Sequence, residues 1–190
     1  MKFPNSYKIL KTSQYELDNI KIVPIRYEDR LLIMSWRNEQ MYHLRQKKLL
    51  TEADQNNYFD NVVSKLFDAN EPNQLLFSYL QDDVCIGYGG LVHINWNDKN
   101  AEISFIIDPR LEKDYFHYHW TAYLPLIERI AFEGLDLRKI YTYAFDLRPQ
   151  LYKAVEAAGF EKEAELKEHF LHNSGYKSVV IHSKWNIMNG

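Results

Sequence analysis

The stretch Ala101-Glu-Ile-Ser-Phe-Ile-Ile-Asp108-Pro109 predicts a strand with an abrupt end. Its middle is apolar and rich in β-branched residues, and the proline at its end has no N–H to donate to a sheet. One carboxylate, Glu102, interrupts the apolar run. In a strand of this kind a carboxylate has either a chemical function or a partner of opposite charge.

Two helices and three strands are predicted before this stretch. The apolar runs at 75–80 and 84–94 flank a Gln-Asp-Asp turn, which indicates a hairpin. Thr51 and Asp54 resemble a capping box, and apolar residues recur behind them at helical spacing. The predicted elements are a strand at 20–26, helices at 28–38 and 51–67, and strands at 75–80 and 84–94.

After the stretch, the chain predicts a helix, a strand, a short helix and a closing hairpin. Pro125 lies within a helical stripe, and proline is tolerated in a first turn, so we expect that helix to begin near residues 120–122. Gly159 ends the short helix. The remaining elements are a strand at 139–145, the short helix at 149–158, and hairpin strands at 163–171 and 176–184.

This order of elements favours an α+β fold over a doubly wound parallel sheet, because hairpin-joined strands occupy its middle. We expect a mixed, mostly antiparallel central sheet with helices on both faces. Residues 20–190 are expected to form a single domain behind a loosely held polar leader at 1–19, with one short strand at most in the leader. The glycines of Gly87-Tyr-Gly-Gly90 indicate a bulge or a close backbone approach within a strand.

Composition excludes several classes of function. A net charge of −3, from 23 basic and 26 acidic residues, argues against a protein that binds nucleic acid through its phosphates. Since no apolar run approaches the ~18 residues of a membrane span, no membrane partner is expected. The single cysteine, Cys85, fits a reducing, cytoplasmic location. The pairs His117/His119 and His169/His172 lack a clear third ligand, so we predict no metal site.

Three short motifs in this order resemble the GNAT acyltransferase superfamily. They are Trp36-Arg37-Asn38 at the end of the first helix, the strand 101–109, and Ala157-Ala158-Gly159-Phe160 before the closing hairpin. The first is similar to the branch that acetylates ribosomal proteins and nucleotide-linked amino sugars. The resemblance implies a GNAT-like acyltransferase domain over 20–190, acetyl-CoA as cosubstrate, a small-molecule amine as acceptor and a possible homodimer.

The sequence lacks the glycines of the loop with which the family binds the coenzyme pyrophosphate. By alignment with the family helix this loop falls on 115–120, where Tyr118 and Trp120 replace expected glycines. Glycine lets backbone N–H groups close on a phosphate, and aromatic residues block that approach. The resemblance assigns the pantetheine and the oxyanion to the backbone of Phe105, Ile106 and Ile107. Arg110 and Lys113 are expected to supply the missing positive charge.

The resemblance also points to three candidate catalytic side chains. Glu102 is the leading general base, because burial would raise the pKa of its carboxyl group. The alternative is a partly exposed strand residue, or an ion pair with a neighbour such as Arg37. His93 is a second base candidate, or a strand-end histidine with a structural partner. Tyr152 is the nearest phenol to protonate the leaving thiolate, or simply a core residue.

The acceptor side is expected along the first two helices. Trp36, Arg37 and Arg45 are the predicted substrate-binding residues, with Asn38, Tyr42 and His43 beside them; in the alternative, Trp36 and Tyr42 belong to the core. Guanidinium groups bind phosphate and aromatic rings stack on bases and sugars, so a nucleotide-linked amino sugar of surface-polysaccharide synthesis is the leading acceptor. The alternatives are a protein N-terminal acetyltransferase and a non-catalytic binding or regulatory module that has lost the coenzyme.

Overall fold

The structure, a computed structural model, describes residues 2–186. Within these residues the strands form one eight-stranded sheet in the order β1-β2-β3-β4-β5-β6-β8-β7. Every neighbouring pair is antiparallel except β5 and β6, which are parallel. The strands are β1 Tyr15–Leu17, β2 Ile20–Pro24, β3 Leu75–Gln81, β4 Val84–Asn95, β5 Asn100–Ile107, β6 Lys139–Phe145, β7 Glu161–His172 and β8 Gly175–Trp185.

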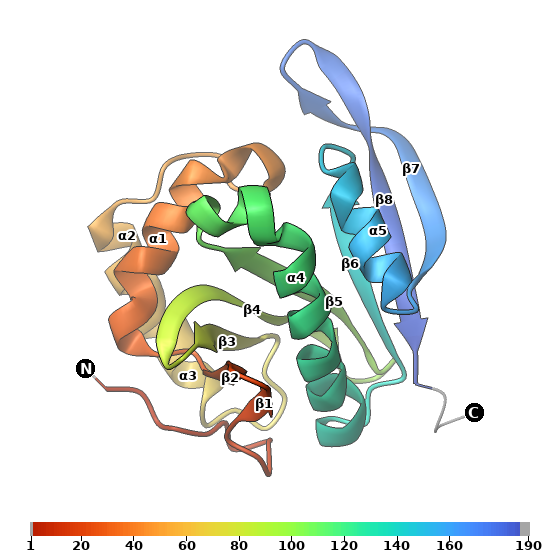
Figure 1. The fold of residues 1–190 in the computed structure, drawn as a ribbon. Coiled ribbons are helices and arrows are strands. Elements are labelled where there is room, and N and C mark those ends of the chain that lie inside the picture. The colour runs from red at the N-terminus through yellow and green to blue at the C-terminus, as the bar shows by residue number, and fades with distance from the viewer. Residues whose placement is uncertain (1, 187–190) are drawn as a thin grey trace.

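Helices cover both faces of this sheet, so the expected mixed α+β fold is confirmed. They are α1 Arg30–Glu39, α2 Glu52–Tyr58, α3 Ser64–Leu66, α4 Pro109–Glu128 and α5 Pro149–Ala157, with 3-10 turns at Tyr27–Asp29 and Met41–His43 and π-helical turns at Phe59–Val63 and Arg129–Gly134. Figure 1 shows α4 and α5 side by side across one face, with α1 and α2 together to their left. The predicted capping box of Thr51 and Asp54 starts α2.

Successive residues of β5 point to opposite faces of the sheet, which assigns each helical layer to a face. The ring of Phe105 stacks on Tyr123 of α4, with centroids 3.9 Å apart and planes 4° apart. Ser104, the preceding residue, lines a hollow beneath α1 and α2 together with Ile33 and Tyr58. The side chain of Glu102 therefore lies on the α1 face, and that of Phe105 lies on the α4 face.

The parallel strands β5 and β6 separate soon after they begin to pair. They are in register only at Asn100–Lys139, Ala101–Ile140 and Glu102–Tyr141. Beyond that point β6 continues to pair with β8 as far as Phe145, while β5 runs on towards α4. Among the described strands, the edge of β5 after Glu102 therefore has no strand partner on its β6 side, and a wedge opens between the two strands.

The glycines of β4 allow the strand to lie unusually close to its neighbours, as the sequence predicts. Gly90 has a φ of +155°, and a Cβ there would lie 1.9 Å from the carbonyl oxygen of Leu75. A Cβ on Gly89 would lie 2.3 Å from the carbonyl oxygen of Ser104. Side chains at these positions would push β3 or β5 away, so the glycines set the spacing of the sheet next to the wedge.

 Helix α4 begins at Pro109, about three helical turns before the expected start. The expected start near residues 120–122 is therefore wrong. Asp108 caps the helix, since its carboxylate accepts the N–H of Arg110, and Pro109 occupies the first helical position, where no N–H is needed. Pro125 lies in the helix interior, at a cost of about 3 kcal/mol. Burial of the neighbouring Tyr123, Leu124 and Leu126 offsets that cost.

The segment before β2 is packed into the fold, which contradicts the expected loosely held leader. Phe3, Tyr7, Leu10 and Tyr15 are all buried, and the Tyr7 hydroxyl donates to the carbonyl oxygen of Leu76 at 2.6 Å. The i, i+4, i+7 spacing of Phe3, Tyr7 and Leu10 resembles that of a helix face, but this segment folds into bends and turns rather than a helix. These side chains close the end of the core, so this segment contributes to the stability of the domain.

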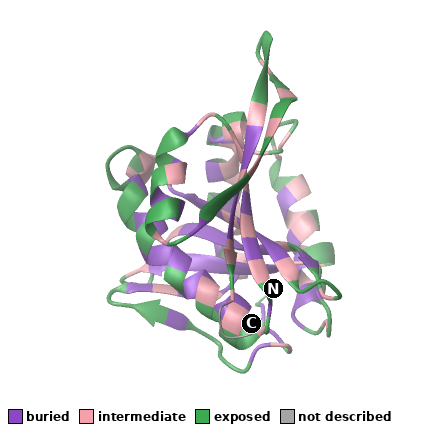
Figure 2. Ribbon diagram, turned by 90° about the vertical axis from the view of Figure 1, so that its right-hand side faces the viewer, coloured by how far each residue is buried: buried purple, intermediate pink, exposed green. Residues whose placement is uncertain are grey.

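The interior and the periphery differ sharply in burial. Figure 2 shows buried residues concentrated in the central strands and the inner sides of the helices, while the β7–β8 hairpin projects from the body with mostly exposed residues.

Within residues 2–186, no helix is long and apolar enough to cross a membrane. The same residues contain no cluster of three or more His, Cys, Asp or Glu side chains arranged to hold a metal ion.

Candidate active site

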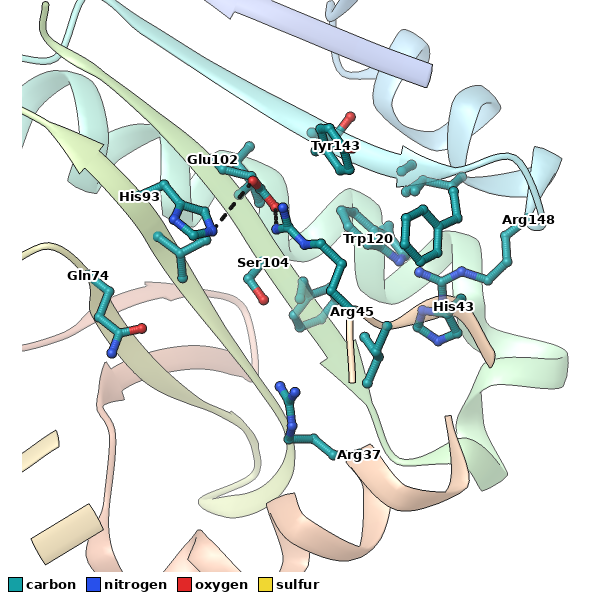
Figure 3. Close-up of a pocket in the computed structure, with 18 of the residues that line it drawn as sticks. Arg37, His43, Arg45, Gln74, His93, Glu102, Ser104, Trp120, Tyr143 and Arg148 are labelled. Atoms are coloured by element: carbon teal, nitrogen blue, oxygen red, sulfur yellow. Dashed lines mark hydrogen bonds and ion pairs between the residues drawn. The ribbon is translucent and has the colours of Figure 1, made fainter. Parts of the chain in front are cut away.

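A cleft of about 330 Å³ occupies the wedge between β5 and β6 (Figure 3). Its wall includes side chains from both faces of the sheet, because the wedge interrupts the sheet itself. The α1 side and the sheet contribute Arg37, His43, Arg45, Gln74, His93, Glu102 and Ser104, and the α4 side and β6 contribute Phe105, Trp120, Thr142, Tyr143, Phe145, Arg148 and Leu151. A ligand can therefore reach the free edge of β5 from either face.

The carboxylate of Glu102 lies at the floor of this cleft and is only 5% exposed. Arg45 donates from Nη2 to Oε1 of Glu102, and Nε2 of His93 lies 3.9 Å from Oε2 (Figure 3). Burial raises the pKa of Glu102 above its ordinary value, and the nearby positive charge of Arg45 opposes part of that shift. The expected alternative pairing with Arg37 is wrong, since Arg45 is the partner.

A β-bulge directs His93 towards this carboxylate. The register between β4 and β5 shifts between Val92 and Asn95, and His93 has a φ of 51°. This left-handed conformation is uncommon for residues other than glycine and occurs in bulges that redirect a side chain. The sequence pattern places His93 on the correct strand, but the bulge is what brings its ring towards Glu102.

Positive charge dominates the wall of the cleft. Arg37, Arg45 and Arg148 all line it, and Glu102 is the one carboxylate among the described lining residues. The Arg45 guanidinium also lies over the ring of Tyr143, 4.8 Å from its centroid. Arg45 and Arg148 pair with carboxylates, those of Glu102 and Glu112, whereas Arg37 hydrogen-bonds to the neutral groups of Gln46 and Tyr88.

The Trp36-Arg37-Asn38 motif organises one wall of the site. Arg37 donates from Nη1 to the Tyr88 hydroxyl at 2.5 Å and from Nε to Oε1 of Gln46 at 3.0 Å. The proximity of the Tyr88 hydroxyl raises the pKa of Arg37, so its charge is retained. Trp36, by contrast, is 5% exposed and packed into the core. The expectation that Trp36 contacts substrate is therefore wrong, whereas Arg37 does line the cleft.

His43 and Arg148 close the opposite end of the cleft (Figure 3). Burial and the neighbouring Arg148 guanidinium lower the pKa of His43 to about 3, so its imidazole is neutral near pH 7. Arg148 donates from Nη1 to Oε1 of Glu112 at 2.7 Å. Sequence reasoning missed Arg148. The one feature of the sequence that could have indicated Arg148 is its position directly before Pro149, where α5 begins shortly after the end of β6.

Tyr152 is not among the residues that line the cleft. Its hydroxyl donates to Oδ1 of Asp146 at 2.8 Å, and its ring stacks on His182 with centroids 5.2 Å apart. Burial and the adjacent carboxylate raise the pKa of Tyr152. The proposed role as a thiolate acid is not supported by this position, because the preceding residue, Leu151, is the one that α5 presents to the cleft.

The residues expected to bind the coenzyme divide between the cleft and other positions. Phe105 and Trp120 line the cleft, but Ile106 and Ile107 are buried and do not. Lys113 lines a separate open hollow with His117 on α4. Tyr118 is 47% exposed on the same helix. The structure therefore brings together only part of the predicted set.

The start of α4 is already occupied by an acidic side chain. The Asp108 carboxylate accepts the backbone N–H of Arg110 at 2.9 Å and also pairs with its guanidinium. Residues 115–120, which the sequence comparison assigned to a loop, lie within the helix. The family's glycine loop has no counterpart at this position, as the sequence indicates, and Arg110, which was expected to supply charge to the pyrophosphate, is engaged with Asp108.

Residues 22–180 match the family model described as acetyltransferase (GNAT) domain. The chain belongs to this family. It is an acetyltransferase, and the enzymes of this family use acetyl-CoA as cosubstrate. No curated protein sequence matches the chain.

Solved structures of the same fold come from Vibrio cholerae. A spermidine N-acetyltransferase in complex with CoA and spermine has a TM-score of 0.75 and 20% sequence identity, and the match covers 89% of this chain and 96% of that chain. A dodecameric structure of spermidine N-acetyltransferase has a TM-score of 0.70 at 20% identity, covering 89% and 95% of the two chains. At this identity the likeness shows the fold.

The GNAT cleft fits acetyl-CoA at its acyl end. The free edge of β5 offers backbone groups to an extended arm, and Thr142 provides a buried hydroxyl that has no hydrogen-bond partner among the described residues. At the pyrophosphate end, the Asp108 cap differs from the cradle that the family resemblance implies. The fit is therefore good for the pantetheine arm and does not extend to the phosphates at the start of α4.

Proposed function

We propose that this GNAT enzyme acetylates the amino group of an acceptor that also carries phosphate, with a nucleotide-linked amino sugar as the leading candidate. The observation that carries the proposal is the charge of the cleft, in which Arg37, Arg45 and Arg148 surround a single lining carboxylate, Glu102. Guanidinium groups bind phosphate through paired hydrogen bonds. The rings of Tyr143 and Phe145 add surfaces on which a base or sugar can stack.

In the proposed reaction the neutral acceptor amine attacks the thioester carbonyl of acetyl-CoA. A C–N bond forms, the C–S bond breaks, and CoA leaves as a thiolate that takes a proton from solvent. Glu102 removes a proton from the acceptor's ammonium group to give the neutral amine that attacks, because its carboxylate is at the cleft floor and its raised pKa suits proton transfer. His93 helps to position Glu102 from the adjacent bulge. Backbone groups at the free edge of β5, around Phe105, hold the acyl arm and stabilise negative charge on the carbonyl oxygen.

The same electrostatic argument separates this acceptor from a polyamine and from a protein N-terminus. A polyamine is a polycation and would meet three arginines in the cleft. The relatives in the solved structures are spermidine N-acetyltransferases, so spermidine is the second acceptor to test. We also infer a cytoplasmic location, in keeping with the one buried cysteine, Cys85.

A panel assay tests the proposal. Release of free CoA thiol is followed with acetyl-CoA and one of four acceptors: spermidine, an N-terminal peptide, a free amino sugar, or the same sugar linked to a nucleoside diphosphate. We expect the highest kcat/KM for the nucleotide-linked sugar, and a fall of roughly 10-fold or more in that value for Arg37→Ala. Arg129→Ala is the matched control, since Arg129 contacts the Tyr15 ring outside the cleft.

Transfer to spermidine or to the peptide, with none to the nucleotide sugar, would overturn the proposal. If no acceptor releases thiol and millimolar acetyl-CoA does not raise Tm, the binding-module alternative is supported instead. A ligand at 100 times its Kd should stabilise the fold by about 2.7 kcal/mol, which a melting experiment detects.

A further inference from the structure

The carboxylate of Glu102 is covered by a cation of the protein itself. Arg45 reaches down from the segment between α1 and α2 to donate to Glu102, and its guanidinium lies over the Tyr143 ring (Figure 3). An acceptor ammonium ion that approaches Oε1 of Glu102 would need the position that this guanidinium occupies, since His93 lies 3.9 Å from the other oxygen, Oε2. Arg45 and a substrate ammonium ion therefore compete for the same carboxylate.

The Arg45 side chain is placed to move without disturbing the core. It is 47% exposed, whereas the side chain of Glu102 is 7% exposed. The backbone beside it is held independently, because the next residue, Gln46, bonds to both Arg37 and Asn38. Rotation of one long side chain is therefore sufficient to uncover Glu102, and the segment that carries it can stay in place.

We propose that Arg45 selects the acceptor by exchange: the substrate ammonium replaces its guanidinium at Glu102, and the released guanidinium binds a phosphate of the same substrate. This inference rests on the proposed function, because it specifies how an amine acceptor with a phosphate is recognised. Arg45 acts as a specificity-determining residue in this scheme, and Glu102 is the group that touches the reacting amine.

The charge balance of the cleft explains why both groups of the acceptor are needed. The buried carboxylate of Glu102 keeps one cationic partner before and after the exchange, so no uncompensated charge is left at the cleft floor. The displaced Arg45 remains in a cleft that Arg37 and Arg148 also line, and it needs an anion there. A phosphate supplies that anion, whereas a polyamine leaves the guanidinium without a partner and adds further positive charge.

Three titratable or charged groups lie next to Glu102. Arg45 faces it from the segment after α1, His93 faces it from β4, and Tyr141 lies beside it on β6. Burial raises the pKa of Glu102, while Arg45 and His93 lower it. If Arg45 leaves for an anion, the pKa of Glu102 rises further. This change can be measured without any acetyl transfer.

The experiment uses UDP, which has the phosphates and no amine, as the probe. Its Kd is measured by calorimetry for the wild type, Arg45→Gln, Arg45→Lys and the control Arg129→Gln. The pKa of Glu102 is followed by ¹³C-carboxyl NMR with and without UDP, and Glu102→Gln assigns the signal. We expect Arg45→Gln to weaken UDP binding roughly 10- to 100-fold, Arg45→Lys to weaken it less, and Arg129→Gln to leave it unchanged.

We also expect UDP to raise the pKa of Glu102 in the wild type, because UDP carries no ammonium group and a proton then takes the place of the Arg45 guanidinium at the carboxylate. In Arg45→Gln that pKa should already be raised without ligand and should respond little to UDP. Equal UDP affinity in the wild type and Arg45→Gln would overturn the inference, as would no binding of millimolar UDP to the wild type. If the proposed function itself is wrong, a different measurement shows it: the panel assay then detects no acetyl transfer to nucleotide sugars. Transfer to those sugars with no dependence on Arg45 would leave the proposed function intact and reject the exchange.

Discussion

Asn38 binds both backbone polar groups of Leu50. Its Nδ2 donates to the carbonyl oxygen of Leu50 at 2.9 Å, and its Oδ1 accepts the N–H of Leu50 at 2.8 Å. Oδ1 also accepts from Nε2 of Gln46 at 2.9 Å. One side chain at the end of α1 thus fixes both the middle and the end of the segment that carries Arg45.

Asn38→Ala should therefore weaken the site as well as the fold. Three hydrogen bonds are lost and a partly buried segment loses its anchor, so we expect the free energy of unfolding to fall by about 1–3 kcal/mol. The KM for the acceptor should rise, because Arg45 and Gln46 are no longer held in place, while the KM for acetyl-CoA changes little. Urea unfolding and steady-state kinetics measure the two effects.

Asn61→Ala is the matched control for that prediction, because Asn61 bonds within an exposed helical turn to Asn57. It should alter stability by less than about 0.5 kcal/mol and should not alter either KM. If Asn38→Ala leaves the acceptor KM at the wild-type value, the motif has a structural role alone.

Glu102→Gln should lower kcat on the true acceptor by roughly 10²–10⁴ and leave the KM for acetyl-CoA nearly unchanged. The amide has the shape of the carboxyl group but does not accept the proton. Because the pKa of Glu102 is raised by burial, the wild-type rate should fall with decreasing pH already above the ordinary range for glutamate, as the carboxylate becomes protonated. The variant should lose this acidic limb. Near-normal turnover in Glu102→Gln would make the residue structural and His93 the next base to test.

The pH dependence of stability should contain a contribution from His43. Burial and Arg148 lower its pKa in the folded chain to about 3, whereas an unfolded histidine binds a proton near ~6.5. Below that pH the unfolded state takes up a proton that the folded state does not, so stability is complete above pH ~6.5 and decreases as the pH falls towards 3.

Between pH 7.5 and pH 5, the wild type should thus lose about 2 kcal/mol more unfolding free energy than His43→Gln does. Chemical denaturation at several pH values gives both curves. Parallel curves for the two proteins would show that His43 does not contribute to this loss.

Much of the sheet is predictable from local sequence, because β-branched and apolar runs separated by polar turns report strands directly. The starts of helices are less certain. At Asp108-Pro109 a strand ends and helix α4 begins without a loop between them. Pro125, in the interior of that helix, wrongly indicates a later helix start. The packing of the leader is harder still to predict, since Phe3 and Tyr7 lie outside any helix or strand and pack on Phe59 and Phe67, which are distant in the sequence.

Site residues can be predicted from the sequence where the strand that carries them fixes their position. Glu102 and His93 lie on neighbouring strands, so their proximity is implied by the hairpin, although the bulge at His93 is not. The partnership of Arg45 with Glu102 depends on how a segment without regular periodicity is anchored. Tyr152 was misplaced by one residue of helical phase, which turns a side chain by ~100° around a helix axis.

Asp108→Asn tests how the chain accommodates the phosphates of acetyl-CoA. The amide oxygen can still accept the N–H of Arg110 and cap α4, but the negative charge at the helix start is removed. Helix N-termini favour anions, and Arg110 is released from its carboxylate partner. We therefore expect the KM for acetyl-CoA to fall by roughly 3- to 10-fold. Stability should decrease by about 0.3–1 kcal/mol, because a favourable charge at the helix N-terminus is lost.

The truncated donor S-acetyl-pantetheine separates this effect from a general change in the cleft, because it has the acyl arm and lacks the phosphates. Its KM should be the same for the wild type and Asp108→Asn. The control Asp83→Asn removes an acid in the turn between β3 and β4 that pairs with Lys21 of β2. The KM values of both donors should be the same in this variant as in the wild type. An unchanged or higher KM for acetyl-CoA in Asp108→Asn would show that the phosphates bind away from this helix start, for which the hollow lined by Lys113 and His117 is then the next site to mutate.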